Sequence, residues 1–175
     1  IGLGHWGPNH LRVFNSLPGS KVVAVADTDA SRIQRVAGSV AGLRAYASGE
    51  ALLADAEVGA VVISTPTSTH HGLVEAALRS GKHVLCEKPL CLSSQEADSL
   101  AELSGQVGRI LMVGHVFLFN PGLVKIRELL AAGELGEVRY LSAVRTNLGP
   151  IRRDVNAGWD LASHDIAVFN WLLGS

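Results

Sequence analysis

The glycine pattern at the start of the chain constrains its fold more than any other feature. Residues 1–7 read Ile-Gly-Leu-Gly-His-Trp-Gly, so Gly2, Gly4 and Gly7 have the Gly-x-Gly-x-x-Gly spacing of a dinucleotide-binding turn. In such a turn the first glycine permits a tight bend, the second lets the backbone approach a pyrophosphate, and the third allows close helix packing. A strand must precede the pattern and a helix must follow it, and Pro8 suits the first turn of that helix.

The residues that follow supply the second half of this βαβ unit. We expect a helix over 9–17, a break at Pro18-Gly19 and an apolar strand over 21–26. Asp27 ends that strand, where a carboxylate accepts hydrogen bonds from the adenosine ribose and repels a 2′-phosphate, which favours NAD over NADP. The alternative interpretation is a tight turn followed by a helix-capping aspartate.

Strand and helix patterns alternate along the next ninety or so residues. Further strands are expected at 43–46, 59–64, 83–86 and 110–116, and helices at 29–36, after Ser48, at 69–80 and at 93–104. Residues 59–64 are apolar on both faces, as in a strand buried within a parallel sheet. The alternation predicts an α/β Rossmann domain over residues 1–119, with a doubly wound parallel sheet covered by helices on both faces.

The pattern changes after residue 119. A helix is expected over 121–132, an alternating, half-exposed strand over 138–145, a polar loop over 146–156 and a helix over 160–173. Residues 120–175 therefore form the start of a second domain. Because the chain has no initial methionine, opens inside the fingerprint and stops at a helix end, we expect it to be truncated at both ends.

The composition excludes several classes of protein. Hydrophobic residues make up 47% of the chain, charged residues 18%, and the formal net charge is −1, so neither a nucleic-acid nor a membrane-surface partner is expected. Apolar runs are only strand-length and no secretory signal is visible, which favours a cytoplasmic protein. Cys86 and Cys91 are accordingly expected to be reduced. His70, His71 and His83 have no partners at zinc-ligand spacing, so no metal is predicted.

Two polar loops follow predicted strands. Thr65-Pro66-Thr67 follows 59–64 and Glu87-Lys88-Pro89 follows 83–86, and ligands of open α/β sheets bind at these carboxyl ends. Pro89 restricts Lys88 to extended geometry, which aims a lysine suited to proton transfer at the cofactor cleft. Taken alone, a lysine at a strand end such as Lys88 is more often a solvated surface residue. Thr67 can cap the next helix as well as face the cofactor.

Asp160 and His164 are four residues apart in the last predicted helix, so they share one face of it. Imidazole exchanges protons near neutral pH and a neighbouring carboxylate orients it, which is the pairing of a general base. The adjacent Asp165 would face elsewhere. The alternative is a helix-terminal aspartate with an exposed or core histidine. His115 either borders the cleft or belongs to the core.

Together these residues resemble the Gfo/Idh/MocA family of oxidoreductases along essentially the whole chain. The resemblance is carried by residues 2–7, Asp27, residues 65–70, Glu87-Lys88-Pro89 and the Asp160-x-x-x-His164 pair. It implies an N-terminal Rossmann domain and a C-terminal α/β domain with a mainly antiparallel sheet, which commonly forms a homo-oligomer interface.

The resemblance also implies residue roles. Lys88, Asp160 and His164 would be catalytic, in hydride transfer to NAD from a secondary hydroxyl of a sugar, nucleotide sugar or cyclitol. The implied cofactor-binding residues are Gly2, Leu3, Gly4, His5, Trp6, Gly7, Asp27, Thr65, Pro66, Thr67, His70, Glu87, Lys88 and Pro89.

Within the family, residues 113–121 and 153–156 resemble the branch of the UDP-N-acetylglucosamine 3-dehydrogenase type. Ala167 stands where many members have an aspartate, which leaves the substrate class open. Arg145, Arg152 and Arg153 either meet a substrate phosphate or carboxylate or lie in a solvated loop. Two other functions remain: an NADP-dependent reductase of the same fold, and a non-catalytic dinucleotide-binding regulator.

Overall fold

The computed structural model describes residues 1–146, 155–156 and 158–174, and it divides the chain into two compact units, Ile1–Val113 and Gly114–Ser175. Each unit is described by itself. Arg152 and Arg153, with most of the expected polar loop, lie outside the described residues. Among the residues that are described, no helix has both the length and the apolar character needed to cross a membrane.

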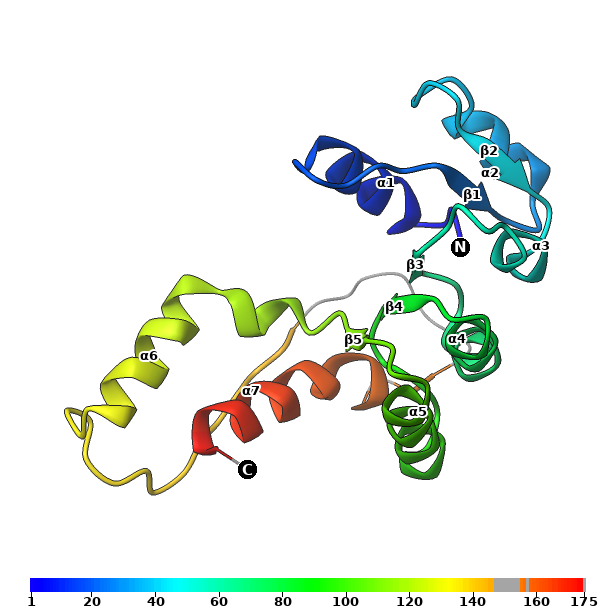
Figure 1. Ribbon diagram of the computed structural model, residues 1–175. Helices are drawn as coiled ribbons and strands as arrows, with labels where there is room; N and C mark the ends of the chain where they lie inside the picture. Colours follow the sequence, from blue (N-terminus) through cyan, green and yellow to red (C-terminus); the bar gives the residue numbers. More distant parts are fainter. Residues whose placement is uncertain (147–154, 157, 175) are drawn as a thin grey trace. The chain divides into compact units, whose positions relative to one another are not determined.

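The first unit alternates strands and helices, as the sequence predicts (Figure 1). In chain order its elements are α1 (Gly7–Ser16), β1 (Ala24–Ala26), α2 (Ala30–Val36), β2 (Arg44–Tyr46), α3 (Gly49–Leu53), β3 (Ala60–Ile63), the 3₁₀ helix η1 (Thr67–Thr69), α4 (His70–Arg79), β4 (His83–Cys86), α5 (Ser94–Val107) and β5 (Leu111–Val113).

The sequence places the helix starts well. Asp29, Ser48 and Ser93 each accept a hydrogen bond from a backbone N–H in the first turn of the helix that follows. At the start of α5 the Ser93 hydroxyl accepts from the Glu96 N–H, and the Glu96 carboxylate accepts from the Leu92 N–H.

The strands are parallel throughout. β1 pairs with β2, and β3, β4 and β5 pair in that order. Ile1 and Gly2 lie between the two sets: the Gly2 N–H donates to the Ala26 carbonyl, while Ile1 donates to Val62 and accepts from Ser64. These two residues therefore occupy the central position of a doubly wound sheet, with strand order diverging to either side.

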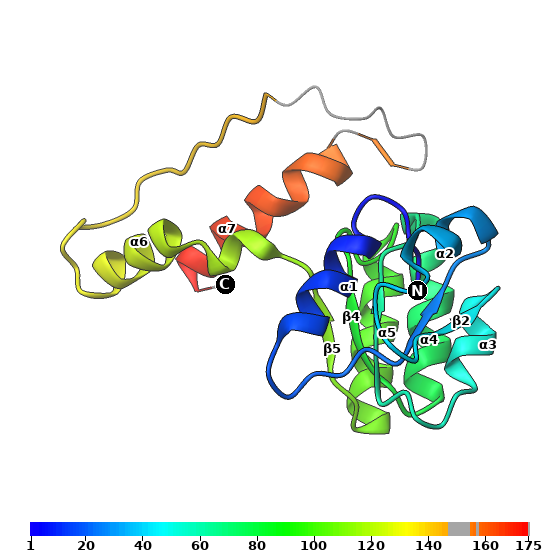
Figure 2. The same cartoon turned by 90° about the horizontal axis from the view of Figure 1, so that it is seen from above.

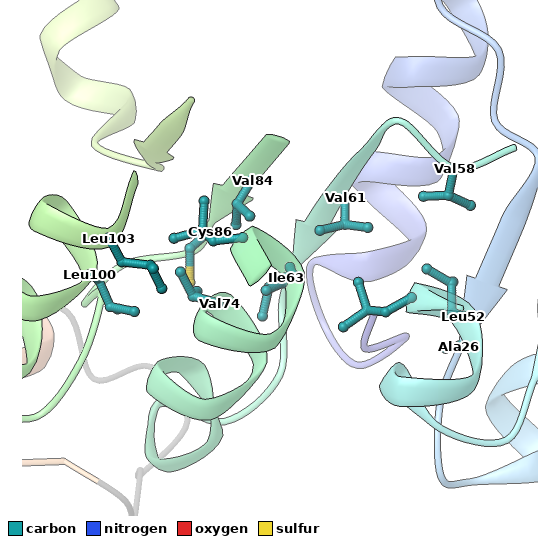
Figure 3. Packing of buried hydrophobic residues seen from close by; sticks show 13 residues of the cluster. Ala26, Leu52, Val58, Val61, Ile63, Val74, Val84, Cys86, Leu100 and Leu103 are labelled. Carbon is teal, nitrogen blue, oxygen red and sulfur yellow. The ribbon is translucent and has the colours of Figure 1, made fainter. Parts of the chain in front are cut away.

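The core lies directly beneath the strand ends that carry the polar loops. α4 packs against β3, β4 and α5, and Figure 3 shows Ile63, Val74 and Cys86 meeting Leu100 and Leu103 in this layer. Burying each large aliphatic side chain of this kind contributes about 1.5–3 kcal/mol. A smaller cluster of Leu3, Leu11, Val25 and Val36 fixes α1 and α2. The glycine turn and both polar loops thus rest on rigid packing.

The regular elements described in the second unit are helical. It contains the 3₁₀ helix η2 (Val116–Phe119), α6 (Pro121–Ala131), the π-helical turn η3 (Gly158–Ala162) and α7 (Ser163–Leu173). α6 packs against α7 (Figure 2).

In the region after residue 110, one predicted strand is shorter than expected and another is not formed by the described residues. The expected strand 110–116 ends at Val113, and η2 follows it. The alternating segment 138–145 forms neither strand nor helix, because a strand needs a hydrogen-bonding neighbour and none of the described segments of this unit supplies one.

Candidate active site

The glycine turn has one open and two crowded positions. A Cβ added at Gly2, whose φ is +89°, would lie 2.8 Å from the Ser64 carbonyl carbon, and one added at Gly7 would overlap the Gly2 carbonyl oxygen. Gly2 and Gly7 therefore permit the close crossing of backbone and helix. A Cβ at Gly4 would meet nothing within 4 Å, so there is room beside Gly4 for a ligand to approach the backbone.

Helix α1 begins at Gly7, close in sequence to this opening. Its N-cap residue, Trp6, makes no side-chain capping bond, and the first turn contains no acidic residue. The N–H groups of a helix start and the positive end of its dipole attract anions such as phosphate. The turn therefore fits the pyrophosphate of a dinucleotide. His5 and Trp6 pack edge to face beside it, and Trp6 is half exposed.

Asp27 holds the glycine turn in place. Its Oδ2 accepts from the Leu3 N–H at 2.7 Å, its Oδ1 accepts from the Asp29 N–H at 2.8 Å, and the residue is only 7% exposed. Arg32 lies 3.6 Å from the same carboxylate. A carboxylate has about four acceptor sites, so these bonds leave capacity for ribose hydroxyls. The bond to the turn has no signal in sequence spacing.

His70 contacts the backbone of both polar loops from the buried side. Its ring nitrogens lie 2.9 Å from the carbonyl oxygens of Thr65 and Pro89, one in each loop, and the residue is 1% exposed. The sequence suggests that His70 binds the cofactor, but the buried ring contacts the backbone of both loops. Thr67 is also buried beneath the first loop.

Glu87 is held by a histidine from α1. His10 Nε2 lies 2.8 Å from Glu87 Oε1, and the second carboxylate oxygen accepts from the Lys88 N–H. Burial alone would raise the pKa of Glu87, but the hydrogen bond and charge of His10, with the Lys88 backbone and charge, lower the pKa below its usual value. Glu87 is therefore an anion beside Lys88. The sequence gives no indication of the His10 contact, because 77 residues separate the partners.

Lys88 itself follows β4 by two residues, and the Lys88–Pro89 peptide is cis. Beneath it, burial and the charge of Glu87 raise the pKa of the Cys86 thiol, so Cys86 is a neutral core residue. The Cys91 thiol donates to the Ser93 carbonyl. Both cysteines are thus thiols, as the sequence predicts.

Asp160 and His164 belong to the second unit. Asp160 lies in the π-helical turn η3 and His164 is the second residue of α7, 9% exposed. The rings of Phe117 and His115 pack edge-on to the His164 ring, with centroids 4.8 Å and 6.4 Å away. Asp165 binds Arg145. Because Lys88 lies in the first unit, a shared site of Lys88, Asp160 and His164 stays a prediction.

The first unit combines a glycine turn at an open helix start, a carboxylate after β1 and polar loops after β3 and β4. These features define a dinucleotide-binding domain of the oxidoreductase class. Residues 1–115 match the family described as "Oxidoreductase family, NAD-binding Rossmann fold", Gfo/Idh/MocA. The chain belongs to this family, which confirms the resemblance found in the sequence.

Known proteins resemble the chain over nearly its full length. It is 34% identical to inositol 2-dehydrogenase 2 of Saccharopolyspora erythraea, over 99% of this chain and 52% of that protein. It is 37% identical to UDP-N-acetylglucosamine 3-dehydrogenase of Acidithiobacillus ferrooxidans, over 100% of this chain and 53% of that protein. The crystal structure of an NAD-binding protein from Listeria innocua superposes with a TM-score of 0.81 at 27% identity, over 98% of this chain and 52% of that one. The chain thus spans about half the length of the curated relatives it matches.

Proposed function

We propose that the protein is an NAD-dependent dehydrogenase that oxidises a secondary hydroxyl of a cyclitol, sugar or nucleotide sugar. The observation that carries this proposal is the glycine turn anchored by buried Asp27, with Lys88 on a braced loop at the same carboxyl edge of the sheet. Family membership and relatives named as dehydrogenases of inositol and of UDP-N-acetylglucosamine support it.

The cofactor fits the residues that are present. The backbone beside Gly4 and the start of α1 would hold the pyrophosphate, and Asp27 would accept hydrogen bonds from the ribose. When bound, NAD supplies the hydride acceptor.

Three side chains would handle the substrate hydroxyl. His164 takes the hydroxyl proton, Asp160 orients its ring, and Lys88 hydrogen-bonds the same oxygen and stabilises the charge that develops there. The Glu87 anion, fixed by His10, lies beside Lys88. Positioning and proton transfer are thus the contribution of the protein.

Asp27 favours NAD over NADP as the cofactor. It therefore argues against the alternative function, an NADP-dependent reductase. Its carboxylate is buried and committed to the turn, so a 2′-phosphate there would meet a negative charge. Arg32, the nearest cation, is already engaged by Asp27 and Asp29. Titration with NADH and NADPH decides between the two functions, and tighter NADPH binding would favour the reductase.

The test of the main proposal is Lys88→Ala in the protein expressed from its complete gene, with exposed Lys21→Ala as the matched control. Candidate substrates are inositols and UDP-linked amino sugars, the classes that the two relatives act on. We expect Lys88→Ala to lower kcat by at least about a hundredfold with NAD affinity retained, and Lys21→Ala to behave as the unaltered protein. Retained NAD binding with no oxidation across the panel would instead indicate a dinucleotide-binding regulator.

We further propose that the protein is cytoplasmic and homo-oligomeric. The two free thiols of Cys86 and Cys91 support the first property, and the family resemblance supports the second. Light scattering of the complete protein measures its assembly state.

A further inference from the structure

A series of side-chain contacts in the second unit leads from Asp165 to His164. The Arg145 Nε donates to both Asp165 carboxylate oxygens, at 2.9 and 2.8 Å. The guanidinium carbon of Arg145 lies 4.4 Å from the centre of the Phe117 ring. The Phe117 ring in turn lies 4.8 Å from the His164 ring, with the two planes at 78°. The guanidinium and the imidazole therefore contact the same aromatic ring.

These contacts join three segments of the unit. Phe117 comes from η2, Arg145 from the irregular segment after α6, and Asp165 and His164 from the first turn of α7. The side chains of Arg145 and Asp165 are 27% and 21% exposed, so their ion pair is partly shielded from water and stronger than a surface pair. A guanidinium held between a carboxylate and a ring face keeps little of its rotational freedom.

We propose that Arg145 is a positioning residue for His164, acting through Phe117 and held in place by Asp165. This inference rests on the proposed function, in which His164 takes the hydroxyl proton. In this proposal Arg145 supports His164 and does not bind a substrate phosphate. Asp165 holds the Arg145 side chain.

The arrangement affects His164 in two ways. The edge contact with Phe117 restricts the orientation of the imidazole, and a small misplacement of a reacting group lowers turnover by up to about a hundredfold. The charges also act on its proton: Arg145 disfavours the imidazolium and Asp165 favours it. Among the described residues, the titratable groups Asp160, four residues earlier in the chain, and His115, whose ring centre is 6.4 Å from that of His164, are unchanged in both variants below.

The test compares Arg145→Met and Asp165→Asn in the complete protein, with Arg139→Met as the matched control. Arg139 pairs only across the surface with Glu137, and its side chain is 79% exposed. We expect Arg145→Met to lower kcat about ten- to hundredfold, with the KM for NAD within about twofold of the unaltered protein. Arg139→Met should change neither constant.

The pH profile separates positioning from a merely structural role. A general base must be deprotonated, so activity rises with pH as His164 loses its proton. Removing the Arg145 cation should move this rise to higher pH, whereas Asp165→Asn, which removes an anion, should move it to lower pH. Shifts in the same direction, or unchanged kcat in Arg145→Met, would overturn the inference.

Failure of the proposed function would be recognised separately. If the unaltered protein oxidises no substrate, the proposed function is wrong. The role of Arg145 is then tested by an NMR titration of the His164 ring in the same variants. Opposite displacements of the titration midpoint support the contact series, and equal midpoints overturn it.

Discussion

Replacing Asp27 by Asn tests two roles of this carboxylate: it stabilises the glycine turn, and it favours NAD over NADP. In the folded chain its two oxygens accept from the backbone N–H groups of Leu3 and Asp29, at 2.7 and 2.8 Å. An Asn side chain has one acceptor oxygen, so one N–H would face an amide N–H₂ instead. Leaving a buried donor unpaired costs about 1–3 kcal/mol, and we expect the free energy of unfolding to fall by that amount.

The same substitution should narrow the preference for NAD. Removing the negative charge that opposes a 2′-phosphate should raise the NADPH affinity relative to NADH by at least about tenfold. Urea denaturation followed by circular dichroism measures the first effect, and nicotinamide fluorescence titration measures the second. Asp98→Asn, an exposed change on α5, is the control. An Asp27→Asn protein of unaltered stability and unaltered cofactor preference would refute both roles.

Three further outcomes follow from the first unit. Burial lowers the pKa of the Ile1 ammonium from 8.0 to about 6, against the smaller opposing charge of Asp27. Because the folded state binds this proton more weakly than the unfolded chain does, the free energy of unfolding of the chain beginning at Ile1 should fall by about 2 kcal/mol as the pH drops from 8 to 6. A flat urea-denaturation profile would contradict this. Gly4→Ala should fold normally but weaken NAD binding, because a Cβ at Gly4 meets nothing within 4 Å. Gly7→Ala should also lower the melting temperature, because a Cβ there overlaps the Gly2 carbonyl oxygen; calorimetry with and without NAD distinguishes the two variants. His70→Ala should lower the free energy of unfolding by about 2–4 kcal/mol and should also lower kcat. The control, His71→Ala at the adjacent and more exposed position, should change neither quantity. Equal effects of the two substitutions would show that the contacts of His70 with the two loops are unimportant.

The sequence predicts the first unit closely because its signals are local. Glycine spacing, caps such as Asp29 and Ser48, and apolar runs such as 60–63 each determine an element within a few residues. The carboxyl-end rule then places Lys88 and the Thr65 loop at one edge of the sheet without knowledge of tertiary contacts.

Contacts between distant segments are not predictable in this way. The bonds from Asp27 to the turn, from His10 to Glu87 and from His70 to the two loops depend on how elements pack, and no periodicity encodes them. The segment 138–145 shows the converse: its alternation favours a strand, but alternation alone supplies no hydrogen-bonding partner.

The central claim is that this protein moves a hydride from a secondary carbinol carbon to NAD with the help of Lys88. The most direct measurement uses inositols and UDP-linked amino sugars deuterated at the ring carbinol carbons and follows deuterium into the reduced cofactor by mass spectrometry. We predict transfer of deuterium from at least one of these substrates by the complete protein and its loss in Lys88→Ala. Absence of transfer from every substrate, or transfer at an unchanged rate in Lys88→Ala, would contradict the claim.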